Sequence, residues 1–254
     1  METVRRPFQG ITNIVRFNWH FYILSLCLII SILWLNSYFD NAFQAYAYIL
    51  CFLIVFTTVT SLLVSYIVYD VSHLYKLTWL DTVPILKTDT FVNINAGFDE
   101  TSVLIKAKYP DNPLIVYDFY DPQKHTEVSI ERARAAYPPY PNTQVITTTK
   151  IPLSENCIDV IFLTLAAHEI RDAQERAAFF KELNRILKTN GQIIVTEHLR
   201  DLPNFLAYNI GFFHFISLKS WHKTFDDAAL TITNTIKITP FISTFILKKN
   251  GIAS

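Results

Sequence analysis

Residues 151–164 read IPLSENCIDVIFLT, a short polar turn followed by an apolar run at 157–164. An apolar run of this length is typical of a strand that is buried on both faces of a sheet. An amphipathic helix is predicted next at 172–188, opened by an acidic cap and ended by Gly191. Another apolar strand is predicted at 192–197. This strand, helix and strand indicate one parallel βαβ unit.

The same alternation continues outward from this unit. Earlier strands are predicted at 90–95, 113–118 and 143–147, with helices between them at 99–109 and 122–136. The end of the chain departs from the alternation, because two β-rich runs at 230–238 and 241–247 flank Thr239-Pro240 and predict an antiparallel hairpin. The predicted fold class is therefore α/β, a mostly parallel sheet with a C-terminal antiparallel hairpin.

The N-terminal part contains two long runs without charge. No Asp, Glu, Lys or Arg occurs between Arg16 and Asp40, or between Asp40 and Asp70. A bilayer core of about 30 Å needs about 20 apolar helical residues, so two transmembrane helices are predicted at about 18–37 and 43–69. The alternatives are two apolar core helices of a soluble protein or, for the first run, a cleaved signal peptide. The second span and the lack of a small-residue cleavage site argue against the signal peptide.

Basic residues predict the orientation of this hairpin. Three arginines precede the first span and two lysines follow the second, whereas the turn between them has none. The positive-inside rule then places both termini in the cytoplasm, and a prokaryotic inner membrane is the simplest location. Residues 7–17 are expected along the membrane surface. We expect a membrane anchor at 1–70 and one α/β domain at 71–254.

Composition excludes several classes of protein. Lys and Arg total 22 and balance 22 Asp and Glu, so no basic surface for nucleic acid is expected. The cysteines Cys27, Cys51 and Cys157 have neither disulfide-framework nor metal-finger spacing, and no metal site is predicted. Five glycines exclude a full G-x-G-x-x-G loop. Tyr120 and Lys124 spell the Y-x-x-x-K of short-chain dehydrogenases, but they come too early in the chain for that role.

Residues 151–163, 168–170 and 179–195 together resemble the class I S-adenosylmethionine-dependent methyltransferases, particularly those that methylate quinones and lipids. They are similar to that family's LPF-x-D-x-x-F-D strand and its E-x-x-R-x-L-K-P-G-G helix and strand. The resemblance covers about residues 66–250. It implies a Rossmann-like seven-stranded sheet, S-adenosyl-L-methionine as the cofactor, and a pocket at the carboxyl ends of the strands.

The resemblance also implies where the cofactor binds. In the loop after the first strand, Asn93 stands for the family's acid, Asn95 and Asp99 replace two glycines, and Gly97 alone remains. Asn and Asp tolerate left-handed backbone better than other residues, so the turn can form. Asp118 is expected to accept the ribose hydroxyls. The implied cofactor-binding residues are Tyr69, Asp70, Asn93, Asn95, Ala96, Gly97, Asp118, Phe119 and Leu165, with Asp121 as the rival of Asp118.

Candidate catalytic residues follow the fourth and fifth strands. His168 and Glu169 are expected to face the reacting centre, and His198 is the second candidate. The alternative for His168 is a structural histidine bonded to backbone. The run His-Glu-Ile-Arg is not the zinc motif H-E-x-x-H, because Asp172 occupies the last position. Tyr69 and Asp70 are expected to help to close over the cofactor. The alternative for Tyr69 is a tyrosine that anchors the chain at the membrane interface.

The apolar segment 202–216 opens a helix near Pro203. This segment either packs on the sheet or borders the substrate pocket and touches the membrane. Methyl transfer relies largely on alignment and exclusion of water, so the absence of a catalytic triad does not oppose it. The expected function is a membrane-anchored methyltransferase acting on a lipid-like or small hydrophobic acceptor. The alternative is a membrane-tethered pseudo-methyltransferase that acts as a scaffold.

Overall fold

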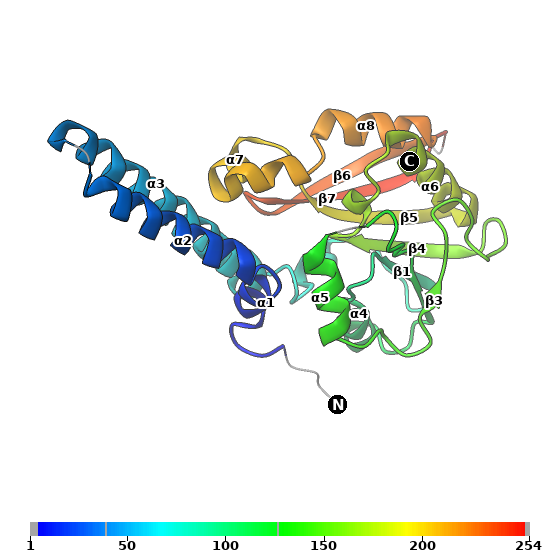
Figure 1. Ribbon diagram of the computed structural model, residues 1–254. Coiled ribbons are helices and arrows are strands. Elements are labelled where there is room, and N and C mark those ends of the chain that lie inside the picture. The colour runs from blue at the N-terminus through cyan, green and yellow to red at the C-terminus, as the bar shows by residue number, and fades with distance from the viewer. Residues whose placement is uncertain (1–4, 39, 126, 252–254) are drawn as a thin grey trace.

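The computed structural model describes residues 5–38, 40–125 and 127–251. Within them, one sheet has the strand order β3-β2-β1-β4-β5-β7-β6 (Figure 1). Strands β1 to β5 run parallel, whereas β7 pairs antiparallel with both β5 and β6. The strands are β1 (Phe91–Asn95), β2 (Leu114–Asp118), β3 (Gln144–Val145), β4 (Ile158–Thr164), β5 (Leu187–His198), β6 (Leu230–Thr239) and β7 (Ile242–Lys249). The predicted α/β sheet with its C-terminal hairpin is confirmed.

Hydrophobic clusters lie on both faces of the sheet. In β4, Ile161 and Leu163 pack with α6 and α8 on one face, while Val160 and Phe162 pack with α4 and η2 on the other. Burial on both faces explains why β4 reads as a continuous apolar run. The elements around the sheet are η2 (Thr78–Thr82), α4 (Ser102–Lys108), α5 (Val128–Ala136), η3 (Ala167–Glu169), α6 (Ala173–Ile186), α7 (Leu202–Tyr208), η4 (Asn209–His214) and α8 (Leu218–Asp227).

Helix α5 begins six residues later than the expected start at Pro122. The backbone before it forms a turn, because the amide N–H groups of Lys124 and His125 donate to the Asp121 carbonyl at 3.0 and 2.8 Å. The His125 Nδ1 atom accepts the Asp121 N–H at 2.8 Å and closes this turn. A local side-chain bond has therefore replaced the first helical turn.

Gly191 does not end α6, which corrects the expectation. Asp172 does cap the helix, since its side chain accepts the Glu175 N–H at 2.7 Å. The helix ends at Ile186, and β5 has already begun when the chain reaches Gly191. A Cβ atom at Gly191 would lie 2.8 Å from the Asp159 carbonyl oxygen in β4. The glycine therefore permits close approach of two strands.

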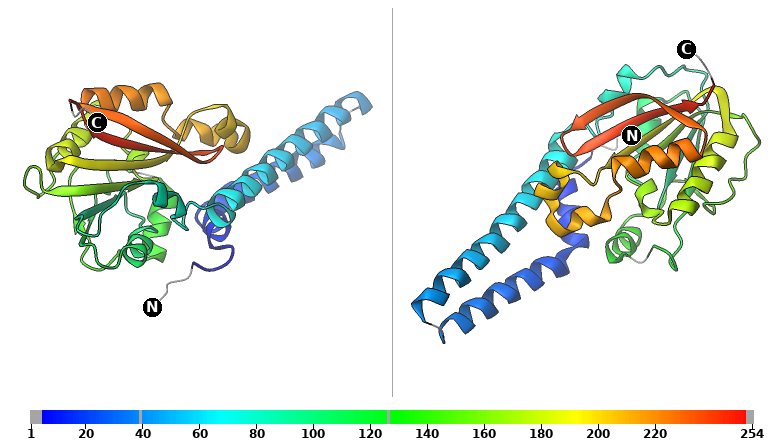
Figure 2. Two further views of the ribbon diagram at one scale, coloured as in Figure 1. Left: turned by 180° about the vertical axis from the view of Figure 1, so that it is seen from behind. Right: turned by 90° about the horizontal axis from the view of Figure 1, so that it is seen from above.

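The N-terminal helices are α1 (Gln9–Phe17), α2 (Trp19–Asn36) and α3 (Asn41–Tyr66), the last continuing into the π-turn η1 (Ile67–Val71). Helices α2 and α3 lie side by side and project away from the sheet (Figures 1 and 2). Both are long and apolar enough to cross a membrane, by length and composition, and only 6% of each 18-residue window is buried. A core helix of a soluble protein would be mostly buried. In the expected turn at 36–41, Phe39 lies outside the described residues.

Candidate active site

The polar side chains of the loop after β1 fold back onto that loop. Asn93 is buried, and its Nδ2 atom donates to Ser102 Oγ at 2.7 Å. The Asn95 Oδ1 atom accepts the Gly97 N–H at 3.0 Å, and Gly97 adopts φ +93°. One oxygen of Asp99 accepts the Thr101 and Ser102 N–H groups, both at 2.9 Å. The turn after β1 is thus held by side-chain hydrogen bonds within the loop and to the start of α4.

The guanidinium of Arg134 occupies the space between Gly97 and Asp118. Its Nη1 atom lies 2.5 Å from Asp118 Oδ2 and 3.3 Å from the Gly97 carbonyl oxygen. The same guanidinium stacks over the Tyr120 ring, 4.4 Å from its centroid. The other carboxylate oxygen of Asp118 accepts the Tyr120 N–H at 2.8 Å. Both oxygens of the expected ribose ligand therefore have protein partners.

Helix α1 packs against the same edge of the sheet. Both oxygens of Asp70 cap it, accepting the N–H groups of Gly10 and Ile11 at 2.7 Å each. Phe17 is buried at its other end, with ring centroids 5.8 Å from Phe98 and 6.2 Å from Tyr137. Helix α1, which the sequence predicted along the membrane surface, therefore covers the loop that follows Gly97.

The N-terminal segment makes a further contact through Glu100. One carboxylate oxygen lies 2.7 Å from Arg5 Nη1, and the other accepts the hydroxyl of Tyr75 at 2.7 Å. The Arg5 guanidinium also lies 3.6 Å from the centre of the Tyr75 ring. Burial and the negative charge of Glu100 raise the pKa of Tyr75 well above its usual value, so its hydroxyl is neutral at pH 7.

His198 is a neutral, fully bonded histidine at the end of β5. Its Nδ1 atom lies 3.1 Å from the Phe241 carbonyl oxygen, which only accepts, so Nδ1 carries the proton. The Nε2 atom then accepts the hydroxyl of Tyr69 at 2.8 Å. Burial lowers the pKa of His198 to about 3, and its ring stacks on Phe215 at 4.6 Å. Tyr69 and His198, both predicted, are thus in direct contact.

His168 lies between two carboxylates. Its Nδ1 atom is 2.6 Å from Glu197 Oε2, and its Nε2 atom is 3.1 Å from Glu169 Oε1. Burial opposes protonation of this ring, but the two carboxylates outweigh it and raise the pKa of His168 to about 10. The same Glu169 oxygen lies 3.3 Å from Nε2 of His214, whose Nδ1 atom contacts Glu127. Burial raises the pKa of Glu169, but His168 outweighs this effect and brings the pKa well below its usual range.

The remaining predicted cofactor residues lie at the same edge. Ala96 and Phe119 are buried in the main core cluster, where Phe119 packs 5.3 Å from the Phe179 ring. Leu165 follows β4 with φ +51° and packs with Val68 and other residues near the root of α3. These three residues shape the edge through apolar contacts.

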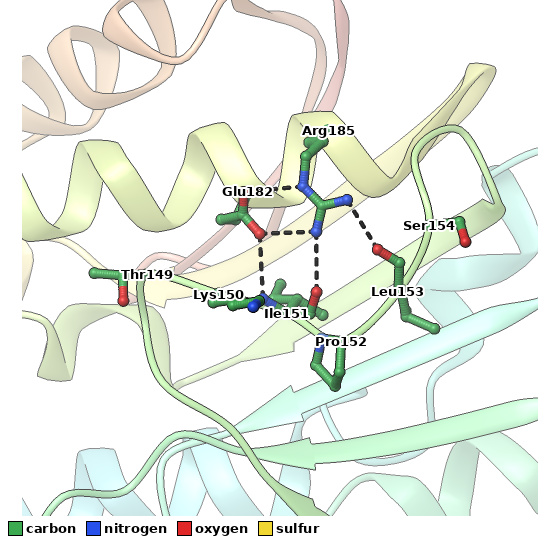
Figure 3. A pocket seen from close by; sticks show the side chains of 8 residues that line it. All are labelled: Thr149, Lys150, Ile151, Pro152, Leu153, Ser154, Glu182 and Arg185. Carbon is green, nitrogen blue, oxygen red and sulfur yellow. Dashed lines mark hydrogen bonds and ion pairs between the residues drawn. The ribbon is translucent and has the colours of Figure 1, made fainter.

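Two cavities are described, and neither coincides with the loop at Gly97. The first, of about 560 Å³, lies between residues 149–154 and α6 (Figure 3). Its polar side chains already pair with each other and with the loop, since Arg185 donates to the carbonyl oxygens of Ile151 and Leu153 at 2.9 and 2.8 Å. The second, of about 360 Å³, lies where α3, α7 and the β6–β7 turn meet. It is lined by Thr60, Val64, Leu202, Pro203, Leu206, Ala207, Pro240 and Phe241.

Four residues of this region were not identified from the sequence: Arg134, Glu197, His214 and Glu127. Glu197 offered a signal, because an acid at the end of an apolar strand needs a partner once it is buried. A histidine within the aromatic run at 212–215 was a weaker signal for His214. Arg134 and Glu127 offered none, since both lie in a stretch rich in charged residues.

Residues 123–195 match the family model described as "Methyltransferase domain". A SAM-dependent methyltransferase from Aquifex aeolicus has a similar structure, with 16% identity and a TM-score of 0.50, over 70% of this chain and 93% of that one. A second, from Methanosarcina mazei, has 13% identity and a TM-score of 0.49, over 65% and 94%. No curated protein sequence matches the chain. The expected resemblance to class I methyltransferases is confirmed in the matched domain and in the fold.

Proposed function

We propose that this protein is a membrane-anchored S-adenosylmethionine-dependent methyltransferase whose acceptor is lipid-like or a small hydrophobic molecule. The observation that carries this proposal is the apolar cavity between α3 and α7. One wall belongs to a helix long and apolar enough to cross a membrane, and the other walls belong to α7 and the β6–β7 turn. Apolar ligands bind in concave sites of this kind.

Segment 202–213 supports an approach from the membrane. Its large apolar side chains are strongly exposed, with Ile210 at 83%, Leu202 at 67% and Leu206 at 63%. Contiguous exposed apolar residues mark interaction or membrane surfaces. The cavity also adjoins His198, because the cavity residue Phe241 accepts the Nδ1–H of that histidine. A hydrophobic acceptor entering from the bilayer would thus come close to the carboxyl ends of β4 and β5.

The carboxyl edge fits a nucleoside cofactor. A Cβ atom at position 97 would lie within 3.0 Å of both Arg134 and Tyr120, and glycine leaves this space open. The side chains of Asn95 and Asp99 bond to the loop backbone. Asp118 stands at the end of β2, where its carboxylate would accept the two ribose hydroxyls once Arg134 withdraws. The occupant of the space, Arg134, is a flexible side chain that is 37% exposed, and it can rotate toward solvent.

When bound, S-adenosylmethionine would supply a methyl group on a cationic sulfur. We expect the residues at 93–97 and Asp118 to hold it, and Tyr69 to lie beside it. His168 and Glu169 would orient the acceptor, and neutral His198 would hold the Tyr69 hydroxyl in position through its Nε2 atom. Cover by α1 would exclude water from this edge. The anchor at 1–70, the domain at 71–254 and cytoplasmic termini belong to the same proposal.

A membrane-tethered scaffold without catalysis is the second candidate, favoured by Arg134 on Asp118. Isothermal titration of the full-length chain in detergent with S-adenosylmethionine distinguishes the two. A methyltransferase should bind, and Asp118→Ala should abolish binding while the exposed control Asp227→Ala leaves it unchanged. No heat and no thermal stabilisation at millimolar cofactor would leave only the scaffold.

A further inference from the structure

We propose that His168, Glu169 and His214 form a binding site for one divalent transition-metal ion, with Zn²⁺ as the best fit. One ligand atom from each residue lies within 4.8 Å of the others. Two imidazoles and one carboxylate are a ligand set of catalytic zinc sites. The spacing of these residues in the sequence predicted no metal site, because His214 comes 45 residues after Glu169. The inference goes beyond the proposed function, since metal binding does not require the methyl donor.

The distances between the ligand atoms suit a tetrahedral ion. The Nε2 atoms of His168 and His214 lie 3.1 and 3.3 Å from the same oxygen, Oε1 of Glu169. A tetrahedral Zn²⁺ with bonds of about 2.0–2.1 Å holds neighbouring ligand atoms about 3.3 Å apart. All three ligand atoms lie within 4.8 Å of one another, so the two rings would close around the ion while Glu169 stays in place. At least one coordination position would remain open for water or an acceptor oxygen.

The outer nitrogen of each histidine meets a carboxylate. Nδ1 of His168 lies 2.6 Å from Glu197, and Nδ1 of His214 contacts Glu127. Histidines that bind metals usually donate their second ring N–H to a carboxylate, which orients the ring and leaves Nε2 free to coordinate. His168 shows this arrangement, whereas Nδ1 of His214 contacts both Glu127 and the Arg171 guanidinium and would donate to Glu127 once Arg171 withdraws. Both Nε2 atoms contact the same oxygen of Glu169.

The charge around the site also suits a dication. Three carboxylates, from Glu127, Glu169 and Glu197, face these rings. Two cations lie nearby: the buried Arg176, which interacts electrostatically with Glu197, and Arg171. The Arg171 guanidinium lies 2.9 Å from Nε2 of His214 and 3.2 Å from Glu127. The Arg171 side chain is 42% exposed, so it can withdraw into solvent when a metal ion takes its place.

The open position would face the proposed acceptor site. Glu169 follows β4, and His214 ends η4, which directly continues the helix α7 that lines the second cavity. An ion there would act as a Lewis acid toward an oxygen of a bound acceptor. The chemical class that fits is therefore an oxygen ligand, such as a hydroxyl, on a hydrophobic molecule.

The test uses full-length protein in detergent, stripped with a chelator and dialysed. Titration with Zn²⁺ alone, followed by calorimetry and elemental analysis, should give one ion per chain, and Co²⁺ should give the visible spectrum of a tetrahedral site. Mg²⁺ should not compete, because imidazole is a poor ligand for it. His214→Ala should remove the ion, and Glu127→Gln should weaken binding about 10-fold or more.

His222→Ala supplies the control, because His222 is an exposed histidine on α8 outside the cluster. It should bind Zn²⁺ as wild type does, and Arg171→Ala should bind it at least as tightly. Circular dichroism checks that His214→Ala is folded. The proposal is overturned by a chain that takes up no stoichiometric Zn²⁺, or by His214→Ala binding like wild type. Neither result depends on S-adenosylmethionine, so this inference and the proposed function fail separately.

Discussion

Replacing Arg134 with glutamine should tighten the binding of S-adenosylmethionine. The Arg134 guanidinium lies 2.5 Å from Asp118 and 2.8 Å from the Cβ position that Gly97 lacks. A ribose that reaches Asp118 must first displace it. In the wild-type chain, breaking this ion pair makes the free energy of cofactor binding less favourable. The variant has no such pair to break.

The size of the effect follows from the exposure of the pair. Asp118 is only 7% exposed, but the Arg134 side chain is 37% exposed and solvent screens it. Pairs exposed to this degree contribute about 0.5–1 kcal/mol. That free energy corresponds to a dissociation constant about two- to fivefold lower in the variant.

Isothermal titration of wild type, Arg134→Gln and the exposed control Lys223→Gln would measure the change. The control residue pairs with Asp227 on α8 and should leave the affinity unchanged. A lower affinity in Arg134→Gln would refute the reasoning, because the guanidinium would then belong to the cofactor site. An unchanged affinity would also contradict it, since the pair would not need to break.

Three other changes test the structure around this edge. Gly97→Ala should lower the free energy of unfolding by about 1–2 kcal/mol, measured by urea denaturation, because φ +93° strains any residue with a Cβ atom. Asp70→Asn should lower the midpoint of thermal unfolding and cost about 1–2 kcal/mol, since one of the two oxygens that cap α1 is lost. His198 has its pKa lowered to about 3, so the unfolded chain binds a proton below pH 6.5 that the native chain does not. In urea titrations, the free energy of unfolding of wild type, compared with that of His198→Gln, should therefore fall by about 2 kcal/mol between pH 7 and pH 5. If both proteins show the same pH dependence, His198 is not a buried neutral ring.

Local patterns predicted most of the secondary structure. The apolar run at 157–164 forms β4 because both of its faces are covered, and the acidic cap at Asp172 begins α6 where expected. The hairpin around Thr239-Pro240 also forms as predicted. These features depend on a few neighbouring residues, whose periodicity and hydrogen-bonding groups can be read directly from the chain.

Register and long-range packing decided the rest. Gly191 lies inside β5 because β4 approaches it closely, which no pattern near residue 191 could reveal. His214 reaches Glu169, and Arg134 reaches Asp118, only after the chain between them has folded into helices and strands of particular lengths. The amino-acid sequence by itself determined a parallel α/β sheet preceded by two apolar helices, because hydrophobic periodicity is a local property. Only the tertiary structure decided which charged side chains meet at the carboxyl edge, because such contacts depend on the summed geometry of every element between them.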